Sequence, residues 1–296
     1  MIRFGIDFGG TKIEAAALNE RGEFVARVRK PNPGNYDAAL DVVAGLIADA
    51  EAMAGATCAR LGLGIPGSVS PRSGLIRNAN SVYLNGKRFG EDLSQRLARP
   101  VRLTNDANCL ALSEAADGAG AGERVVFAAI LGTGCGGGVV VDGKIVEGRN
   151  GVAGEWGHSP LPWPKPEEYP GPDCWCGRKG CLETWIAGPS FSRDAGFPNG
   201  QATMEAVNGG DPGALAALDR YVDRVGRALA VVCDLIDPDV IVLGGGMSNV
   251  DALYERLPAA IAPHVFSDIF ETPVKKAVHG DSSGVRGAVW LWPLES

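Results

Sequence analysis

The 296-residue chain contains no uninterrupted apolar run of about 18 residues, the length that a membrane-spanning helix requires. It also lacks an excess of basic residues: 28 lysines and arginines stand against 35 aspartates and glutamates, which leaves a net charge of −7. A surface of this sign does not attract nucleic acid or an anionic membrane. Neither is therefore expected as a partner.

No secretory signal peptide is expected, because an apolar strand is predicted directly from Ile2. Cysteine is scarce outside one cluster. Four of the seven cysteines lie apart, in apolar or glycine-rich surroundings, at positions 58, 109, 135 and 233. Such a set does not build a disulfide framework and is typical of a reducing compartment. We therefore expect a cytoplasmic protein.

Two common nucleotide-binding motifs are absent as well. The sequence has no Gly-x4-Gly-Lys-Ser/Thr segment, which marks a P-loop. Gly132, Gly134 and Gly137 have the spacing of a dinucleotide-binding turn, but a predicted strand and an Asp142-Gly143 turn follow them where a helix is needed. Neither a Rossmann fold nor a P-loop fold is expected.

The sequence does contain one strand–turn–strand pattern that occurs twice. Residues 2–18 and 125–141 each read as an apolar strand, a polar glycine-rich turn and a second apolar strand. We predict two β-hairpins with tips at 7–12 and 132–138. These tips can present backbone N–H groups, because glycine permits positive φ and close approach.

Strand-like and helical segments alternate along the chain. Buried strands are predicted from Leu61 and from Val240. Apolar residues follow a helical period in four segments: 36–54, 108–116, 212–234 and 250–262. The alternation predicts an α/β protein. Two halves, each led by a hairpin, predict two lobes with a ligand-binding cleft between them.

A cysteine cluster follows a proline-rich segment. Residues 160–172 hold six of the 19 prolines and are expected to form an ordered, irregular loop or a lid. After it, Cys174, Cys176 and Cys181 combine with His158 into a Cys3His set, the usual ligands of structural zinc. The Cys-x-Cys gap is shorter than usual, and the alternative is three reduced cysteines in a loop. Clustering at metal-ligand spacing favours zinc.

Asp7 ends the first predicted strand beside Gly9, Gly10, Thr11 and Lys12. A carboxylate next to a phosphate-binding turn needs a cation between the two, so Asp7 predicts Mg²⁺, held through water. The alternative is that the aspartate and the threonine only satisfy the hydrogen bonds of the turn. The second tip of the same kind favours the phosphate interpretation.

Asn105 and Asp106 follow one predicted strand and precede a helix. Both residue types commonly cap helices. A carboxylate at this point can also act as a general base that takes a proton from a hydroxyl group during phosphoryl transfer. Position alone leaves both interpretations open.

Glu155, His158 and Glu183 flank the cysteine cluster. Carboxylates and imidazole can accept hydrogen bonds from the hydroxyl groups of a sugar. A histidine that binds zinc through one ring nitrogen can offer the other to a substrate. The alternative is that both glutamates are ordinary surface acids.

In this order, the motifs resemble the ROK family of sugar kinases from end to end. The stretches that carry the resemblance are 7–12, 64–67, 105–108, 132–138, 155–158, 174–183 and 244–247. Within the family, the chain is most similar to bacterial fructokinases that also accept mannose. That finer similarity rests on residues 78–81, 84–86, 161–163, 244–250 and 279–288.

The resemblance implies an actin-like, two-lobed ATPase fold (α/β) with a central cleft and a zinc-bound loop. Residues 1–116, joined by a C-terminal helix at about 283–296, would form the N-terminal lobe, and residues 117–282 the C-terminal lobe. It implies Asp106 as the catalytic base. The implied hexose ligands are Gly67, Asn80, Asn105, Asp106, Glu155, His158 and Glu183. The implied ATP ligands are Gly9, Gly10, Thr11, Lys12, Gly132, Thr133, Gly134, Gly136, Gly137, Gly138, Gly245 and Gly246.

We therefore expect an ATP-dependent kinase that phosphorylates the 6-hydroxyl group of D-fructose, with mannose as a second substrate, Mg²⁺ as cofactor and Zn²⁺ in a structural role. One alternative is an N-acetylglucosamine kinase or glucokinase of the same family, because Glu155, His158 and Glu183 are expected there too. Another is a sugar-sensing regulator without catalysis, which the intact Asp106 and the lack of a DNA-binding segment oppose. The resemblance also implies a homodimer.

Overall fold

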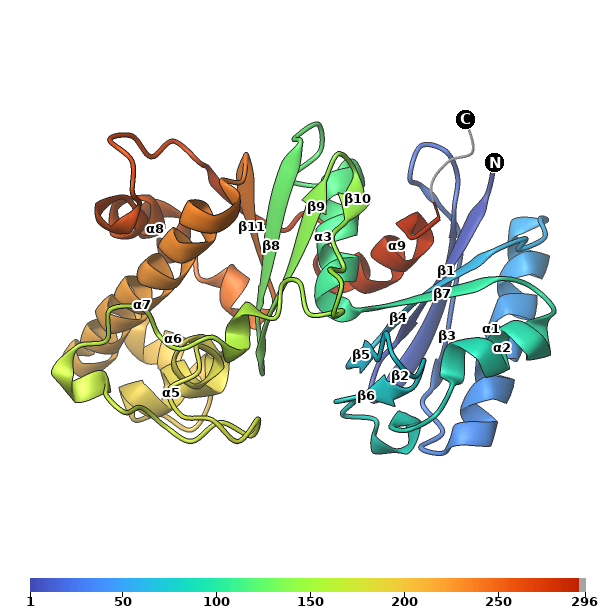
Figure 1. Cartoon of the computed structure of the whole chain (residues 1–296), viewed down its shortest axis with the longest axis horizontal. Coiled ribbons are helices and arrows are strands. Elements are labelled where there is room, and N and C mark those ends of the chain that lie inside the picture. Colours follow the sequence, from blue (N-terminus) through green and yellow to red (C-terminus); the bar gives the residue numbers. More distant parts are fainter. Residues whose placement is uncertain (293–296) are drawn as a thin grey trace. The chain divides into compact units, whose positions relative to one another are not determined.

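The computed structural model describes residues 1–292, and the chain divides into two compact units. The first unit comprises Met1–Gly122, Gly143–Ala153 and the described residues from His279 onward, and the second comprises Glu123–Asp142 and Gly154–Val278. Each unit is built around its own mixed sheet (Figure 1). Within the described residues, no helix combines the length and the apolar character needed to cross a bilayer.

The sheet of the first unit has the strand order β3-β2-β1-β4-β7. Its strands are β1 (Arg3–Phe8), β2 (Lys12–Leu18), β3 (Phe24–Pro31), β4 (Leu61–Ile65) and β7 (Val101–Asn105). The three strands β1, β2 and β3 pair antiparallel, whereas β4 pairs parallel with both β1 and β7. All of β4 is buried, as expected for a central parallel strand that is covered on both faces.

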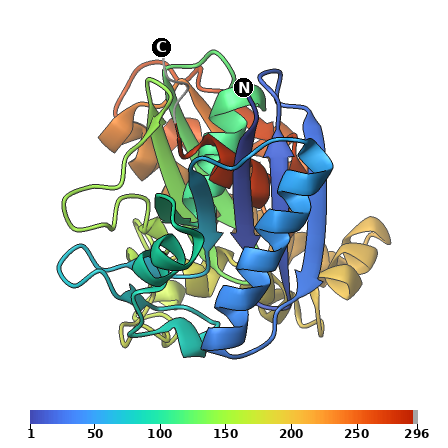
Figure 2. The ribbon, with the colours of Figure 1, turned by 90° about the vertical axis from the view of Figure 1, so that its right-hand side faces the viewer.

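Helix α1 (Tyr36–Ala54) packs on β2 and β3 and crosses one face of this sheet (Figure 2). Helix α9 (Ser283–Trp290) packs on β1 and β4. Its close approach requires glycine at position 62, because a Cβ atom there would lie 1.8 Å from the carbonyl oxygen of Ala288. The remaining elements of this unit are β5 (Ser68–Val69), β6 (Ile76–Arg77), η1 (Val82–Leu84), α2 (Phe89–Leu97), α3 (Asp106–Asp117), β10 (Lys144–Ile145) and η6 (Gly280–Ser282).

In the second unit the strands run in the order β9-β8-β11-β12. They are β8 (Val125–Leu131), β9 (Cys135–Val141), β11 (Val240–Gly244) and β12 (Val274–Lys276). The helices are α4 (Glu183–Ile186), α5 (Gly188–Ala195), α6 (Gly200–Asn208), α7 (Pro212–Ile236) and α8 (Ala252–Ile261), with short 3-10 turns η2 (Trp156–His158), η3 (Pro166–Glu168), η4 (Gly246–Asn249) and η5 (Ala262–His264). Buried side chains of α7 and α8 join those of β8 and β11 in one apolar core.

Both expected hairpins are confirmed, as β1–β2 and β8–β9. The expected helix 36–54 is α1, and the period found at 212–234 continues to Ile236 in α7. Residues 143–153, which the resemblance assigns to the second lobe, lie in the first unit. There β10 contacts α3, and Arg77 donates a hydrogen bond to the carbonyl group of Asn150. The last four residues of the expected C-terminal helix, 293–296, lie outside the described part of the chain.

The proline-rich segment 160–172 is irregular except for η3, as expected. Glu168 from this turn is buried and accepts hydrogen bonds from Arg224 at 2.8 Å and from Arg227 at 2.9 and 3.0 Å. Arg227 also donates to the carbonyl groups of Pro162 and Trp163. The segment is therefore tied to α7 through buried, charge-assisted hydrogen bonds.

Candidate functional site

Asp106 is the first residue of α3, directly after the edge strand β7. The side chain of Asn105 caps the helix by accepting from the Asn108 N–H at 2.8 Å, and one carboxylate oxygen of Asp106 accepts from the Ala107 N–H at 2.8 Å. The Asp106 side chain is exposed to solvent. The protein packed around its carboxyl group nevertheless raises its pKa, because dehydration disfavours the charged form more than the Ala107 N–H favours it. A basic carboxylate at a helix start suits a general base.

Asp7, at the end of β1, also carries a perturbed carboxyl group. Burial raises its pKa to about 6, and the negative charges of Asp106 and Glu14 add to the rise. Helix α9 leaves space for this group, because a Cβ atom at Gly284 would lie 2.8 Å from the Asp7 carboxyl group. The buried thiol of Cys109 also senses both aspartates, since its pKa is raised first by burial and then by their charges. The two carboxylates therefore converge where a divalent cation would relieve their repulsion.

The first hairpin tip lies in the same unit. It is closed by the Gly9 N–H, which donates to the Lys12 carbonyl at 2.9 Å, and Asn32 supports it by donating to the Gly9 carbonyl at 2.8 Å. Gly10, Thr11 and Lys12 are exposed. The tip is thus an open backbone turn of the kind that binds anions.

Of the expected hexose ligands, Gly67 packs on the segment before Asn80, and Asn80 comes close to this tip. Gly67 has a φ of +84°, and a Cβ atom there would lie 2.7 Å from the Ala79 nitrogen, so only glycine lets the two segments touch. The Oδ1 atom of Asn80 lies 3.9 Å from the position that a Cβ atom on Gly10 would take. The first unit therefore assembles one set of predicted residues: Asp7, Gly9, Gly10, Gly67, Asn80, Asn105 and Asp106.

A cavity of about 330 Å³ opens beside Asn105 in the same unit. Its lining mixes apolar groups with a few polar ones: Ser68, Val69, Pro71, Leu103, Thr104, Asn105, Asn108, Glu147, Gly148, Gly151 and Ala153. Asn108 donates to the Thr104 hydroxyl at 2.9 Å, but its own Oδ1 atom is buried and has no hydrogen-bond partner among residues 1–292. A buried acceptor without a partner is costly, so a ligand that donates would satisfy it once the Asn108 side chain turned toward the cavity.

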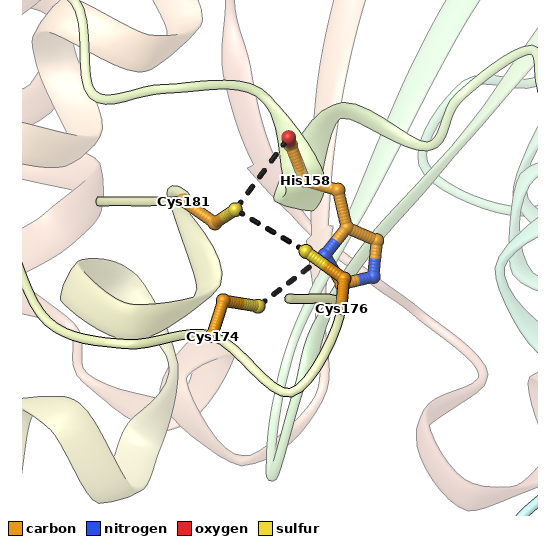
Figure 3. Close-up of side chains that lie close together, drawn as sticks. All are labelled: His158, Cys174, Cys176 and Cys181. Atoms are coloured by element: carbon orange, nitrogen blue, oxygen red, sulfur yellow. Dashed lines mark hydrogen bonds between the residues drawn. The ribbon is translucent and has the colours of Figure 1, made fainter. Parts of the chain in front are cut away.

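The expected metal ligands meet in the second unit. The ligand atoms of His158, Cys174, Cys176 and Cys181 all lie within 4.8 Å of one another. His158 Nδ1 is 3.7 Å from the Cys174 sulfur, and the sulfurs of Cys176 and Cys181 are 3.6 Å apart (Figure 3). Ligand atoms around a tetrahedral zinc ion, with Zn–S bonds of about 2.3 Å, are separated by roughly this distance. The four residues therefore fit a structural Zn²⁺ ion.

Glu183, the first residue of α4, accepts two hydrogen bonds from different segments. Its Oε1 atom accepts from the indole N–H of Trp175 at 2.7 Å, and its Oε2 atom accepts from the Cys135 N–H at 3.0 Å. Trp175 stands between two of the cysteine ligands, and Cys135 begins β9. The carboxylate therefore connects the cysteine loop to the second hairpin.

Glu155 precedes η2, which carries His158. This turn lies against β9: the indole N–H of Trp156 donates to the Gly136 carbonyl at 2.8 Å, and a Cβ atom at Gly137 would lie 2.9 Å from the Trp156 ring. Glu155, His158 and Glu183 are thus carried by segments that pack on, or bond to, the same hairpin. They form the second set of predicted hexose ligands.

The second hairpin tip is shorter than expected. Gly136, Gly137 and Gly138 belong to strand β9, so only residues 132–134 form the turn. The close contact with Trp156 gives Gly137 a packing role. Phosphate binding by the three strand glycines stays a prediction.

The turn at 132–134 lies beside the turn at Gly245, where φ is +80° and a Cβ atom would lie 2.6 Å from the Leu131 carbonyl oxygen. Between these turns and helices α5 and α6 is a cavity of about 830 Å³. Part of its lining was not singled out by any sequence motif: Pro189, Ser192, Arg193, Phe197, Gln201 and Met204. Only the folding of α5 and α6 brings these side chains to the turns.

Known proteins resemble this chain in sequence and in fold. The sequence profile of the ROK family matches residues 3–295. The N-acetyl-D-glucosamine kinase of Pectobacterium atrosepticum is 40% identical over 304 residues, covering 99% of both chains, and that of Photobacterium profundum is 39% identical over 300 residues, covering 97% of this chain and 98% of the relative. The crystal structure of a ROK hexokinase from Thermus thermophilus superposes with a TM-score of 0.87 at 33% identity, covering 98% of this chain and 97% of that chain.

These comparisons overturn the expected fructose specificity. Six further curated relatives, 38–39% identical, are also named N-acetyl-D-glucosamine kinase. The assignment to a fructokinase that also accepts mannose is therefore wrong. The alternative of an N-acetylglucosamine kinase agrees with the relatives.

Proposed function

The chain belongs to the ROK family of sugar kinases, and we propose that it is an ATP-dependent N-acetyl-D-glucosamine kinase that phosphorylates the 6-hydroxyl group. The observation that carries the proposal is the similarity, over nearly the whole chain, to relatives of that name. The residues assembled in the two units supply the chemistry that such a kinase needs.

Asp106 is the proposed base. The 6-oxygen of the sugar attacks the γ-phosphorus of ATP, the bond from that phosphorus to the bridging oxygen of ADP breaks, and the proton of the hydroxyl group moves to Asp106. The raised pKa of Asp106 makes it a stronger proton acceptor than an aspartate with the ordinary pKa. Asp7 would hold Mg²⁺ through water, and the ion supplies positive charge for the phosphate oxygens.

Within the first unit, Gly67, Asn80 and Asn105 stay predicted hexose ligands. Within the second unit, the hexose hydroxyl groups are assigned to Glu155, His158 and Glu183. His158 and the three cysteines would hold Zn²⁺ in a structural role, which stiffens the loop that carries these ligands. His158 would use Nδ1 for the metal, because this atom faces Cys174, and would keep Nε2 for the sugar.

The cavity beside Asn105 supports an N-acetylated sugar over glucose. An acetamido group has one amide N–H, one carbonyl group and one methyl group. The Asn108 side chain, turned toward the cavity, would offer its Oδ1 atom as an acceptor to the N–H, and Val69, Leu103 and Ala153 offer an apolar wall to the methyl group. A cavity that is polar on one side and apolar on the other suits this substituent.

The nucleoside of ATP is assigned to the cavity of about 830 Å³ in the second unit. Gly132, Thr133 and Gly246 line its edge, so that the phosphates would lie over the two glycine-rich turns. Phe197 and Met204 on the opposite wall provide apolar surface for the base.

A coupled assay of ADP formation across N-acetylglucosamine, glucose, fructose, mannose and N-acetylmannosamine tests the proposal. We expect the highest kcat/KM for N-acetylglucosamine. A higher value for any other hexose contradicts the proposed substrate, and no ADP formation with any hexose contradicts the proposed kinase activity. The expected homodimer stays a prediction that light scattering in solution would test.

A further inference from the structure

Trp175 is placed in the cysteine loop in a way that burial does not explain. It lies between Cys174 and Cys176, and 67% of its surface is exposed to solvent. An exposed indole gains little from the hydrophobic effect. Its position therefore has to be explained by the contacts that it does make.

Those contacts are with two of the proposed hexose ligands. The indole N–H donates to Oε1 of Glu183 at 2.7 Å. The ring also stands edge-on to the ring of His158, with centroids 5.0 Å apart and an interplanar angle of 83°. One exposed side chain thus contacts both a carboxylate and the imidazole that shares the metal-binding cluster.

Glu183 is restrained from its other side by the second hairpin. Its Oε2 atom accepts from the Cys135 N–H at 3.0 Å. Gly134 leaves the necessary space, because a Cβ atom there would lie 2.7 Å from Oε2. With one donor on each oxygen, the plane of the carboxylate is set by Trp175 and Cys135 together. A carboxylate held in this way is ready to accept from a sugar hydroxyl without first losing rotational freedom.

We propose that Trp175 is a positioning residue for the hexose site, which holds the Glu183 carboxylate and the His158 ring in their binding orientations. The proposal rests on the function proposed above, in which both residues contact the sugar. The cysteine loop then has a second role beyond holding the metal. It delivers the indole N–H to Glu183, so that metal binding is transmitted to a sugar ligand that does not itself touch the metal.

Two other roles for an exposed tryptophan predict different effects of replacing Trp175 on hexose binding and on zinc content. If Trp175 stacked directly on the sugar, a phenyl ring in its place would preserve binding. If Trp175 only stabilised the loop, its replacement would release zinc. A positioning role through the N–H predicts that Trp175→Phe and Trp175→Ala lose hexose affinity alike and keep their zinc.

The experiment uses the zinc-loaded full chain. Calorimetric titration with N-acetylglucosamine in the absence of nucleotide measures hexose affinity, metal analysis measures zinc, and initial rates separate KM from kcat. For W175F and W175A we expect about tenfold weaker binding, as is typical for loss of a hydrogen bond to a charged group, with a kcat within about twofold of the wild type. Trp163→Phe is the matched control, because Trp163 is also exposed but stacks on His264 instead.

A double-mutant cycle identifies the route. If Trp175 acts through Glu183, W175F should reduce kcat/KM in the wild type but have little further effect in an E183A background. Unchanged binding by W175F, loss of zinc from it, or an equal effect of W175F with and without Glu183 would each overturn the proposal. If the wild-type protein prefers another hexose, the substrate proposal fails, and the same variants are then titrated with that hexose, so the two failures are distinct.

Discussion

Asp7 at the end of β1 and Asp106 at the start of α3 are close enough for the charge of one to raise the pKa of the other. Two acidic groups held together in this way reduce stability in the absence of a cation. A cation that is bound together with a ligand would relieve the repulsion between the two carboxylates. Removing one of the two charges should therefore stabilise the ligand-free protein.

Asp7→Asn should stabilise the ligand-free protein at neutral pH. The pKa of Asp7 is raised from 3.8 to about 6, so the folded state holds its proton more tightly than the unfolded state. The resulting penalty is complete above pH 6 and fades as the pH falls toward 3.8. At pH 7.5 without Mg²⁺ we expect the free energy of unfolding to rise by about 2–3 kcal/mol, and at pH 5 by about half as much.

Chemical denaturation at the two pH values, in the presence of EDTA, measures this gain. Asp37→Asn, at an exposed site in the first turn of α1, is the control. The same D7N variant should lose most of its kinase activity, because its amide does not attract Mg²⁺. A less stable variant at pH 7.5 would refute the account.

Asp106→Asn should separate binding from chemistry. The amide keeps the size of the side chain and its hydrogen bond from the Ala107 N–H, but cannot accept the proton of the sugar hydroxyl. We expect kcat to fall by roughly 10²–10⁴-fold while the dissociation constant of N-acetylglucosamine changes little. Rapid-quench measurement of a single turnover would check the chemical step, and near-normal turnover would remove Asp106 from this role.

Cys176→Ser should remove zinc and weaken hexose binding together. Without one thiolate the remaining three ligands no longer close a tetrahedral site. Metal analysis should show less than one zinc ion per chain, and the KM for the hexose should rise more than that for ATP. Cys233→Ser is the control, because Cys233 is buried in α7 outside the cluster. Active wild-type enzyme without zinc would contradict the site.

Ala153→Leu should change the choice of sugar. The added carbon atoms would occupy the cavity beside Asn105, where we place the methyl group of the acetamido substituent. We expect kcat/KM for N-acetylglucosamine to fall at least tenfold while that for glucose stays within about threefold. The neighbouring Val152→Leu, at an exposed position outside the cavity lining, should leave unchanged the ratio of kcat/KM for N-acetylglucosamine to kcat/KM for glucose. An unchanged ratio in A153L would place the acetamido group elsewhere.

Glu168→Gln should destabilise the second unit. Although burial acts to raise the pKa of Glu168, hydrogen bonds from Arg224 and the Lys165 N–H and the charge of Arg227 hold that pKa below its ordinary value. Loss of the charge leaves two buried arginines with less compensation, so we expect a decrease of about 3 kcal/mol in the free energy of unfolding. Glu167→Gln, an exposed neighbour, is the matched control for denaturation. Equal stability of the two variants would show that the charge of Glu168 between Arg224 and Arg227 does not stabilise the second unit.

The sequence by itself determined the features whose causes are local. Glycine-rich turns between apolar strands, the 3.6-residue period of α1 and the spacing of the cysteines all depend on a few neighbouring residues, and each appears in the structure. The helix expected over 108–116 is α3, but it starts two residues earlier, at Asp106, because Asn105 supplies the cap.

Only the tertiary structure decided the features that join distant segments. The bond from Trp175 to Glu183, the packing of Trp156 on Gly137 and the cavity wall supplied by α5 and α6 leave no mark on the local sequence pattern. Sugar identity is of this kind, since the motif residues are shared by kinases of different hexoses. The cavity to which we assign the acetamido group is space left between folded segments, and such space exists only after the chain has packed.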